Sequence, residues 1–328
     1  MITRRTFLAG QASLLAAIAA GGETINAQTL TQLSRIVVGF PAGGAADTIA
    51  RLLVEQLKEQ APKLIIDNKT GAGGRIALDS MRTSPADGSV LVLTPASMIV
   101  LYPHVYKKLG YDPLKDFTPV TTVCTAPLAV VVGPKAGDKV NSISDFVTWC
   151  KTNPKEAAFG TPGAGSMLHF VGEMLWQSAG IKPIHVPYRG GAPMMQDLIA
   201  GHVPAAVTVL SSAMPQVSAG AVRVLAITGA QRSPFLPEVP TLQEVGFKDI
   251  VADEWYGVLA PADLPSPLVT KLNDAIRSAL KAKKMLDGLA NFGFTATGES
   301  PEDFAALIRN DIQRWGQIVK ASNYVPEE

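Results

Sequence analysis

Apolar and polar positions along the chain form two alternating kinds of pattern. Short β-branched runs such as "RIVVGF" (35–40) and "LIIDN" (64–68) have the character of buried strands. The window 47–60 carries apolar residues three and four positions apart, which is typical of a helix with one buried face. Because strands and helices alternate from Arg35 onward, the pattern predicts an α/β fold with parallel sheets covered by helices.

The same two patterns continue to the C-terminus. We expect further strands at 89–97, 121–134, 157–160, 184–188, 205–210 and 222–229. We expect further helices at 76–82, 142–154 (capped by Ser142 or Ser144), 167–180, 192–201, 267–289 and 301–321.

Two glycine-rich turns each follow a strand and open a helix. They are "FPAGGAAD" (40–47) and "GTPGAGS" (160–166), called here the first and the second glycine turn. Free backbone N–H groups at a helix start attract anions, and ligands of α/β sheets bind beyond the carboxyl ends of strands. Since the two turns fall in different halves of the chain, we expect two α/β lobes that face each other across a cleft.

Neither turn matches a nucleotide-binding motif. The glycines of the first turn do not fall at G-x-G-x-x-G, and the second has phosphate-loop spacing but lacks the lysine before Ser166. A smaller anion suits both turns, with the hydroxyls of Thr161 and Ser166 as additional donors. A purely structural role for each turn remains an alternative. A third glycine stretch, "GAGGR" (71–75), adds Arg75, which is more simply interpreted as a surface residue.

Composition and charge narrow the function classes. The 328 residues are 47% hydrophobic and 17% charged, which suits two lobes with proper cores. The formal net charge is +1, and removal of residues 1–27, with two arginines and one glutamate, leaves about zero. Such a balance argues against nucleic-acid binding and against an electrostatic membrane patch.

The N-terminus has the features of an export signal. Residues 1–22 combine a basic start with a short apolar run, and "INAQ" offers a cleavage point after Ala27. "TRRTFL" (3–8) resembles a twin-arginine signal, although a Sec signal and a membrane anchor remain alternatives. We therefore expect a periplasmic protein that begins near residue 28.

No catalytic or metal-binding motif stands out. Cys124 and Cys150 could form one disulfide in an oxidising compartment or remain buried thiols. His169 and Glu173 share a helical face, but two ligands are too few for a metal. His169 could instead donate to a bound anion. We expect no cofactor, no metal and no enzymatic activity.

Several stretches together resemble one family. They are "RIVVGFPAGGAADTIAR", "DNKTGAGG", "ADGSVLVL", "YDPLKDFTPV", "GTPGAGSMLHFVGEML", "HVPYRGGAPMMQDLIAGHV" and "WYGVLAPADLP". In this order they are similar to the tripartite tricarboxylate transporter solute-binding proteins, also called Bordetella uptake gene (Bug) receptors. The resemblance implies a two-lobed, type II-like periplasmic binding fold. It also implies a small organic carboxylate ligand and delivery to large and small membrane subunits, by a receptor that we expect to be a monomer.

The resemblance also implies boundaries and site residues. The first lobe would comprise 28–125 and 228–328, and the second lobe 126–227. The implied ligand-binding residues are Phe40, Ala42, Gly43, Gly44, Ala45, Asp47, Thr94, Ser97, Thr161, Gly163, Ala164, Gly165, Ser166, His169, Tyr188 and Thr208.

The sequence departs from the family pattern at positions that bear on the ligand. Ala45 and Ala46 replace hydroxyl or glycine residues, Arg75 replaces a frequent asparagine, and Thr208 stands where an aspartate is expected. A receptor for amino acids needs an acidic acceptor for the ammonium group, and Asp47 is more simply a cap on its own helix. We therefore expect an amine-free mono- or dicarboxylate. A secreted two-lobed enzyme, or a binding subunit that feeds a sensor, are the alternative functions.

Overall fold

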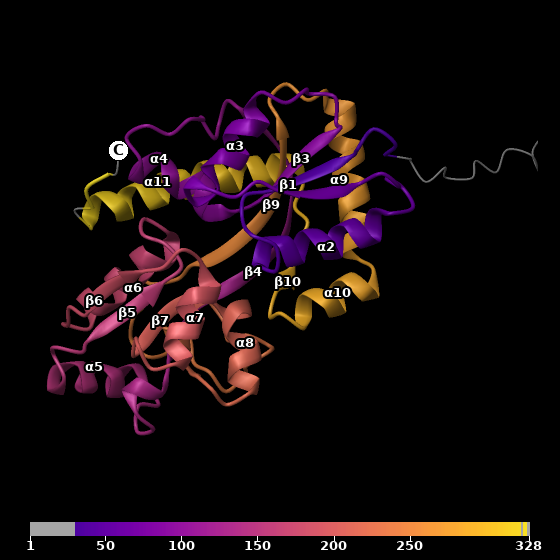
Figure 1. The fold of residues 1–328 in the computed structure, drawn as a ribbon. Helices are drawn as coiled ribbons and strands as arrows, with labels where there is room; N and C mark the ends of the chain where they lie inside the picture. The colour runs from indigo at the N-terminus through magenta and orange to yellow at the C-terminus, as the bar shows by residue number, and fades with distance from the viewer. Residues whose placement is uncertain (1–29, 323, 327–328) are drawn as a thin grey trace, which may run out of the picture.

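The computed structural model describes residues 30–322 and 324–326. The chain forms a mixed α/β structure with two lobes, and the strand β9 (Asp253–Pro261) runs between them (Figure 1). The expected signal peptide and its cleavage after Ala27 lie outside the described residues.

The first lobe combines an N-terminal and a C-terminal part of the chain. The N-terminal part contains β1 (Arg35–Val38), α2 (Ala45–Leu57), β2 (Ile65–Asn68), η1 (Ala72–Gly74), α3 (Arg75–Arg82), β3 (Val90–Pro95), the π-helical turn η2 (Ser97–Leu101) and α4 (Tyr102–Val105). The C-terminal part contains β9, α9 (Ser266–Leu280), α10 (Lys283–Ala290), β10 (Thr295–Ala296) and α11 (Pro301–Ala321).

The second lobe is formed by the middle of the chain, which enters it along the strand β4 (Phe117–Val132). It contains η3 (Pro134–Ala136), α5 (Ile143–Thr152), β5 (Ala158–Thr161), α6 (Met167–Ser178), β6 (Ile184–Pro187), α7 (Gly191–Ile199), β7 (Ala205–Val209), α8 (Leu210–Ser218) and β8 (Arg223–Ile227).

The sheet follows the order β2-β1-β3-β9-β4-β7-β5-β6, with β8 and β10 also paired to β4. The first half of β4 pairs with β9 from Phe117 opposite Pro261 to Pro127 opposite Asp253, and its second half pairs with β7 and β8. The 16 residues of β4 therefore belong to both lobes. The two lobes are joined at residues 125–127 of β4, which pair with the first residues of β9.

The α/β prediction is confirmed, but the expectation of parallel sheets holds only in part. Pairs β1–β2, β1–β3, β5–β6 and β5–β7 are parallel, as strand–helix–strand units require. All pairs made by β4 and β9 are antiparallel. These two strands connect the lobes in opposite directions, a topology that local periodicity does not reveal.

Several elements differ from the sequence prediction, and the short elements η2, α4 and β10 were not expected. The expected helix 267–289 is two helices, because Ala282 has extended backbone (φ −65°, ψ 130°) and caps α10. The strand β9 and the helix α8 were not predicted. The apolar run "VTVLSSAM" changes from strand to helix at Leu210 without a polar break, so its pattern did not mark the boundary.

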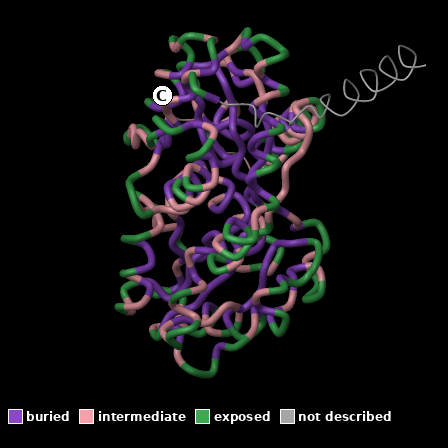
Figure 2. The backbone as a smooth tube through the Cα atoms, turned by 90° about the vertical axis from the view of Figure 1, so that its right-hand side faces the viewer, coloured by how far each residue is buried: buried purple, intermediate pink, exposed green. Residues whose placement is uncertain are grey.

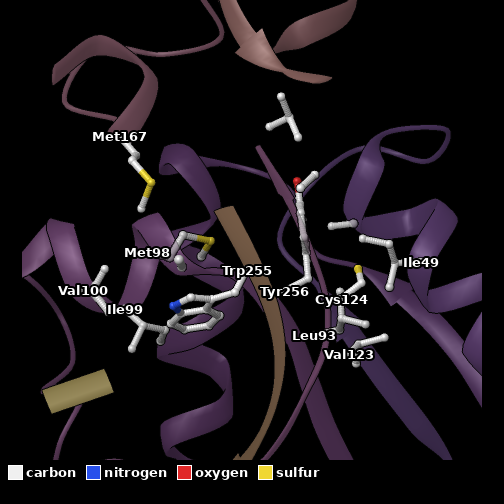
Figure 3. Close-up of a cluster of buried hydrophobic side chains, with 14 of the residues drawn as sticks. Ile49, Leu93, Met98, Ile99, Val100, Val123, Cys124, Met167, Trp255 and Tyr256 are labelled. Atoms are coloured by element: carbon white, nitrogen blue, oxygen red, sulfur yellow. The ribbon is translucent and has the colours of Figure 1, made fainter. Parts of the chain in front are cut away.

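Buried residues fill both lobes and continue through the connection between them (Figure 2). In the close-up of this region, the side chain of Met167 on α6 points toward Met98 and Trp255 of the first lobe (Figure 3). Cys124 and Cys150 are buried free thiols, so the disulfide alternative is not formed. Burial raises the pKa of Cys150 to about 12, which keeps its thiol protonated and unreactive.

The expected end of the second lobe after Ile227 stays a prediction. Residues beyond it still bond to second-lobe backbone: the N–H of Thr228 donates to Leu128 and the N–H of Ala252 donates to Thr228. We propose that the chain returns to the first lobe at Asp253, where β9 begins.

Candidate functional site

Strand register places both glycine turns on the edges where the two lobes face each other. β1 is parallel to β3, whose last residue Pro95 pairs with Tyr256 near the start of β9. β5 is parallel to β7, whose last residue Val209 pairs with Leu128, just beyond the connection between the lobes. The carboxyl ends of β1 and β5, and hence the two turns, therefore open toward the space between the lobes.

The first glycine turn is fixed by the buried carboxylate of Asp47. Its Oδ2 accepts the N–H of Gly43 at 2.9 Å and the Nε of Arg51 at 2.7 Å. Its Oδ1 accepts the amide of Asn68 at 3.1 Å, and that amide also donates to the carbonyl of Phe40. Gly43 adopts a φ of +83°, which a β-carbon disfavours. The interpretation of Asp47 as a cap of α2 was therefore wrong: Asp47 is the third residue of the helix, the N-cap is Gly44, and the carboxylate accepts the N–H of Gly43, one residue before that cap.

The charge of Asp47 is stabilised by its neighbours. Burial alone would raise the pKa of this carboxyl, but the hydrogen bonds from Arg51, Gly43 and Asn68 more than compensate and lower it. Asp47 is therefore ionised at neutral pH and fully engaged, so it has no capacity for a ligand ammonium group.

Backbone donors of the first turn remain free. Among the described residues, the N–H groups of Ala42, Ala45 and Ala46 form no hydrogen bond with a protein acceptor. Gly44 precedes α2 as its N-cap without a side-chain hydrogen bond. Ala45 and Ala46 are the first two helical residues, where unpaired N–H groups carry the positive end of the helix dipole.

The second glycine turn is held by neutral groups. The hydroxyl of Ser166 donates to the carbonyl of Gly163 at 2.8 Å and accepts the N–H of His169 at 3.3 Å. The hydroxyl of Thr161 bonds to Gly163 at 3.0 Å and to Nε2 of His185 at 2.8 Å. Both hydroxyls thus shape the turn. Neither is the spare donor that the sequence suggested.

His169 also contributes a hydrogen bond that holds the second turn. Its Nδ1 accepts the N–H of Gly165 at 3.2 Å, and its Nε2 lies 3.8 Å from Glu173. Its ring stacks on His185 with 3.8 Å between centroids. Burial, followed by the neighbouring His169, lowers the pKa of His185 to about 4, so this imidazole is neutral at physiological pH. His169 therefore positions the turn.

Free donors remain here as well. Within residues 30–322 and 324–326, the N–H groups of Gly163, Ala164 and Leu168 have no protein acceptor. The N–H of Met167 instead reaches across to the hydroxyl of Ser97 in the first lobe, at 3.4 Å. Each turn thus presents several unpaired N–H groups, and no hydrogen bond joins the two turns within the described part of the chain.

The other expected site residues have varied surroundings. The Thr94 hydroxyl bonds to the sulfur of Met98, and the Tyr188 hydroxyl bonds to Asp197 while its N–H donates to Thr161 of the second turn. Thr208 is buried in β7, and its hydroxyl has no partner.

Two nearby features complete the surface around the first turn. A groove of about 680 Å³ extends from Ala42 and Gly43 along α2 to Lys284 of α10. Arg75, which the sequence analysis interpreted as a surface residue, stacks on the ring of Tyr106 at 3.8 Å and donates to the carbonyl of Ala72. It is thus engaged within the first lobe.

Sequence reasoning missed several residues that hold the site together. Arg51 and Asn68 fix Asp47, His185 supports Thr161, and Glu254 accepts hydrogen bonds from Ser97. One signal was available: Glu254 stands directly before the apolar run "WYGVLA", and an acid in a buried strand needs a partner.

No helix of the described residues is long and apolar enough to cross a membrane. The same residues contain no cluster of three or more histidine, cysteine or acidic side chains that could hold a metal ion.

Residues 49–324 match the model of the tripartite tricarboxylate transporter family receptor. The chain belongs to this family. BugT of Bordetella pertussis is 32% identical over 288 residues, which cover 87% of this chain and 88% of BugT. A protein from the tcbD-tcbE intergenic region of Pseudomonas sp. (strain P51) is 31% identical over 97% of this chain and 94% of its own length.

Solved structures confirm the expected two-lobed periplasmic binding fold. Rpa4515 of R. palustris, solved with adipate, is 32% identical with a TM-score of 0.84, over 90% of this chain and 98% of that one. MatC of Rhodopseudomonas palustris, solved with bound malate, is 28% identical with a TM-score of 0.79, over 88% and 98%. This chain is thus a solute-binding receptor of a family of periplasmic binding proteins.

Proposed function

We propose that this receptor binds a small, amine-free organic carboxylate between the two glycine turns and delivers it to the large and small subunits of a tripartite membrane transporter. The observation that carries the proposal is the set of unpaired N–H groups on both turns. Ala45 and Ala46 supply them from the first lobe, and Gly163, Ala164 and Leu168 from the second.

The chemistry of these donors suits a carboxylate. Converging N–H groups at two helix starts complement a compact anion, because each hydrogen bond to a charged group contributes about 1.5–3 kcal/mol. The structures of two relatives with adipate and malate support the same ligand class. A dicarboxylate therefore fits better than a phosphate ester, for which the second turn lacks a lysine.

Amine-free ligands are favoured because the acids near the turns are engaged. Both oxygens of Asp47 hold groups of the first lobe, and both oxygens of Glu254 accept from Ser97. An ammonium group buried beside these turns would lack an acceptor, which is costly.

Calorimetry with matched ligand pairs tests the proposal. Succinate, glutarate, adipate and malate should each raise the midpoint of thermal unfolding. At a ligand concentration one hundred times the dissociation constant, the expected gain in the free energy of unfolding is about 2.7 kcal/mol. Glutarate should bind more tightly than glutamate, and succinate more tightly than aspartate. Tighter binding of either amino acid would contradict the ligand class, and recovery of a chemically altered ligand would favour the enzyme alternative.

Closure on the ligand is part of the proposal. Each turn belongs to a different lobe and supplies half of the donors, so the bound state requires the lobes to approach. Small-angle scattering should show a smaller radius of gyration at saturating ligand, and unchanged scattering would contradict closure.

We further propose export to the periplasm with cleavage after Ala27, and action as a monomer. Mass spectrometry of the protein from a periplasmic extract tests the cleavage point. Co-purification with the membrane subunits, in place of a sensor kinase, tests the transporter partner.

A further inference from the structure

A chain of hydrogen bonds links a buried acid of the first lobe to the helix that follows the second glycine turn. Both carboxylate oxygens of Glu254 lie 3.1 Å from the hydroxyl of Ser97, and one of them accepts the N–H of Ser97 at 2.9 Å. The same hydroxyl accepts the N–H of Met167, the first residue of α6, at 3.4 Å. Two hydrogen bonds thus connect Glu254 to Met167, the residue that precedes Leu168, one of the donors proposed for the ligand.

Glu254 has no cationic partner in the part of the chain that the structure describes. It is 2% exposed and lies at the start of β9, where the lobes connect. Burial raises the pKa of its carboxyl to about 7, the hydrogen bonds from Ser97 oppose this rise, and the negative Asp311 of α11 adds to it. Near neutral pH this side chain is therefore divided between its two protonation states.

The groups around Glu254 supply no competing positive charge. Tyr256 on the same strand and Cys124 on β4 are neutral because burial raises the pKa of both. Arg314 of α11 acts on Asp253 and Asp311, and the contacts of His169 at the start of α6 are with Gly165, Glu173 and His185. A negative ligand near α6 would therefore add a second negative charge close to the ionised carboxylate of Glu254.

We propose that binding of a carboxylate at the second glycine turn drives proton uptake by Glu254, so that the receptor takes up the anion together with a proton. This inference rests on the proposed function. The physical reason is repulsion between two buried anions, which disfavours the ionised form of Glu254. Unit charges roughly 8–10 Å apart at an effective dielectric constant near 20 shift each other's pKa by about one unit.

Protonation also changes the direction of the hydrogen bonds. The ionised carboxylate accepts the hydroxyl proton of Ser97, whereas the protonated acid donates its own proton to the Ser97 oxygen. The hydroxyl hydrogen of Ser97 is then no longer bound to the carboxylate and is free to donate to another acceptor. Proton uptake thus removes a negative charge and adds a donor.

Calorimetry in two buffers of different ionisation enthalpy, PIPES and Tris, measures this uptake. The ligand is whichever of succinate, glutarate, adipate and malate binds most tightly. At a pH slightly above 7, wild-type protein should take up about half a proton per carboxylate bound. Glu254→Gln should bind with uptake close to zero. Asp253→Asn is the matched control, because it removes the adjacent acid of the same strand, and should retain the wild-type uptake.

The outcomes separate this inference from the function on which it rests. If none of the four acids binds, the proposed function fails. If an acid binds without proton uptake, or if Glu254→Gln retains the uptake, the coupling is wrong. Should that variant fail to fold, infrared difference spectra of wild-type protein with and without ¹³C-glutamate labelling replace it. A protonated glutamate carbonyl band must then grow on ligand binding, and its absence overturns the proposal.

Discussion

The two glycine turns face the same space with opposite kinds of support. A buried charge holds the first turn: Asp47 ties together Gly43, Arg51 and Asn68. Hydroxyls and imidazoles hold the second, through Ser166 and His169. Both arrangements leave N–H groups of a helix start unpaired. Helix starts can therefore keep unpaired N–H groups with either a charged or a neutral support, and the kind of support decides how pH affects each turn.

The largest expected effect is the loss of the acid that holds the first turn. Asp47→Ala should lower the free energy of unfolding by about 2–4 kcal/mol and abolish ligand binding, because three donors lose a charged acceptor. Chemical denaturation and calorimetry measure the two effects.

Asp145→Ala is the matched control for this change. Asp145 accepts the N–H of Asn141, four residues earlier, as Asp47 accepts that of Gly43, but it is exposed on α5. Asp145→Ala should lower the free energy of unfolding far less than Asp47→Ala does, and it should leave binding unchanged. Equal losses in the two variants would show that burial of the first-turn acid is unimportant.

The second expected effect is a pH dependence of stability that comes from Glu254 and not from Asp47. The pKa of Glu254 is raised from 4.5 to about 7, so its contribution to stability is complete below pH 4.5 and is lost as the pH rises through 7. The pKa of Asp47 is lowered, so its contribution is constant over this range. Wild-type protein should lose about 3 kcal/mol between pH 4.5 and 8 relative to Glu254→Gln. Parallel pH profiles of the two proteins would contradict this.

The third prediction concerns a substitution that removes one backbone N–H donor from the first turn and no side-chain contact. Ala45 is the first residue of α2 and follows Gly44 in extended backbone (φ −78°, ψ 171°), so proline fits there and only its N–H is lost. Ala45→Pro should weaken ligand binding tenfold or more and leave stability almost unchanged.

Ser266→Pro is the matched control, because it also removes the N–H of the first residue of a helix. Ser266 is exposed at the start of α9, which follows the end of β9 that lies away from the second lobe. Its binding should equal that of wild type. If Ala45→Pro also binds as wild type does, the first turn does not hold the carboxylate.

The smallest expected effect comes from the second-turn hydroxyl. Ser166 caps α6 as Ser142 caps α5, each accepting the N–H of the third helical residue. Ser166→Ala and Ser142→Ala should each cost about 1 kcal/mol of stability. Binding should weaken only a few-fold in Ser166→Ala, through a loosened turn. A loss of tenfold or more would mean that this hydroxyl contacts the ligand directly.

The sequence predicted the elements whose signals are local. The α/β class, the glycine turns next to strands, the cap at Ser142 and the helical face of α2 were all predicted from local patterns. The family and its fold were recognised from ordered motifs along the chain. The sequence placed Asp47 at a helix start but did not show that its carboxylate holds the turn before the helix.

Other features could not be predicted from the sequence because they depend on contacts between residues that are far apart in the chain. The antiparallel pairing of β4 with β9 joins residues more than 120 positions apart. Ser97 and Glu254 are 157 positions apart, and the sequence shows only an acid in an apolar strand. The hydroxyls of Thr161 and Ser166 look like ligand donors until their internal partners are known.

The central claim is that backbone N–H groups of both turns hold one carboxylate at once. The most direct test is a titration of ¹⁵N-labelled protein with the tightest-binding acid of the panel, followed by amide chemical shifts. The account predicts that the amide protons of Ala45 and Ala46 move downfield together with those of Gly163 and Ala164, along one saturation curve. Shifts confined to a single turn, or different curves for the two turns, would contradict it.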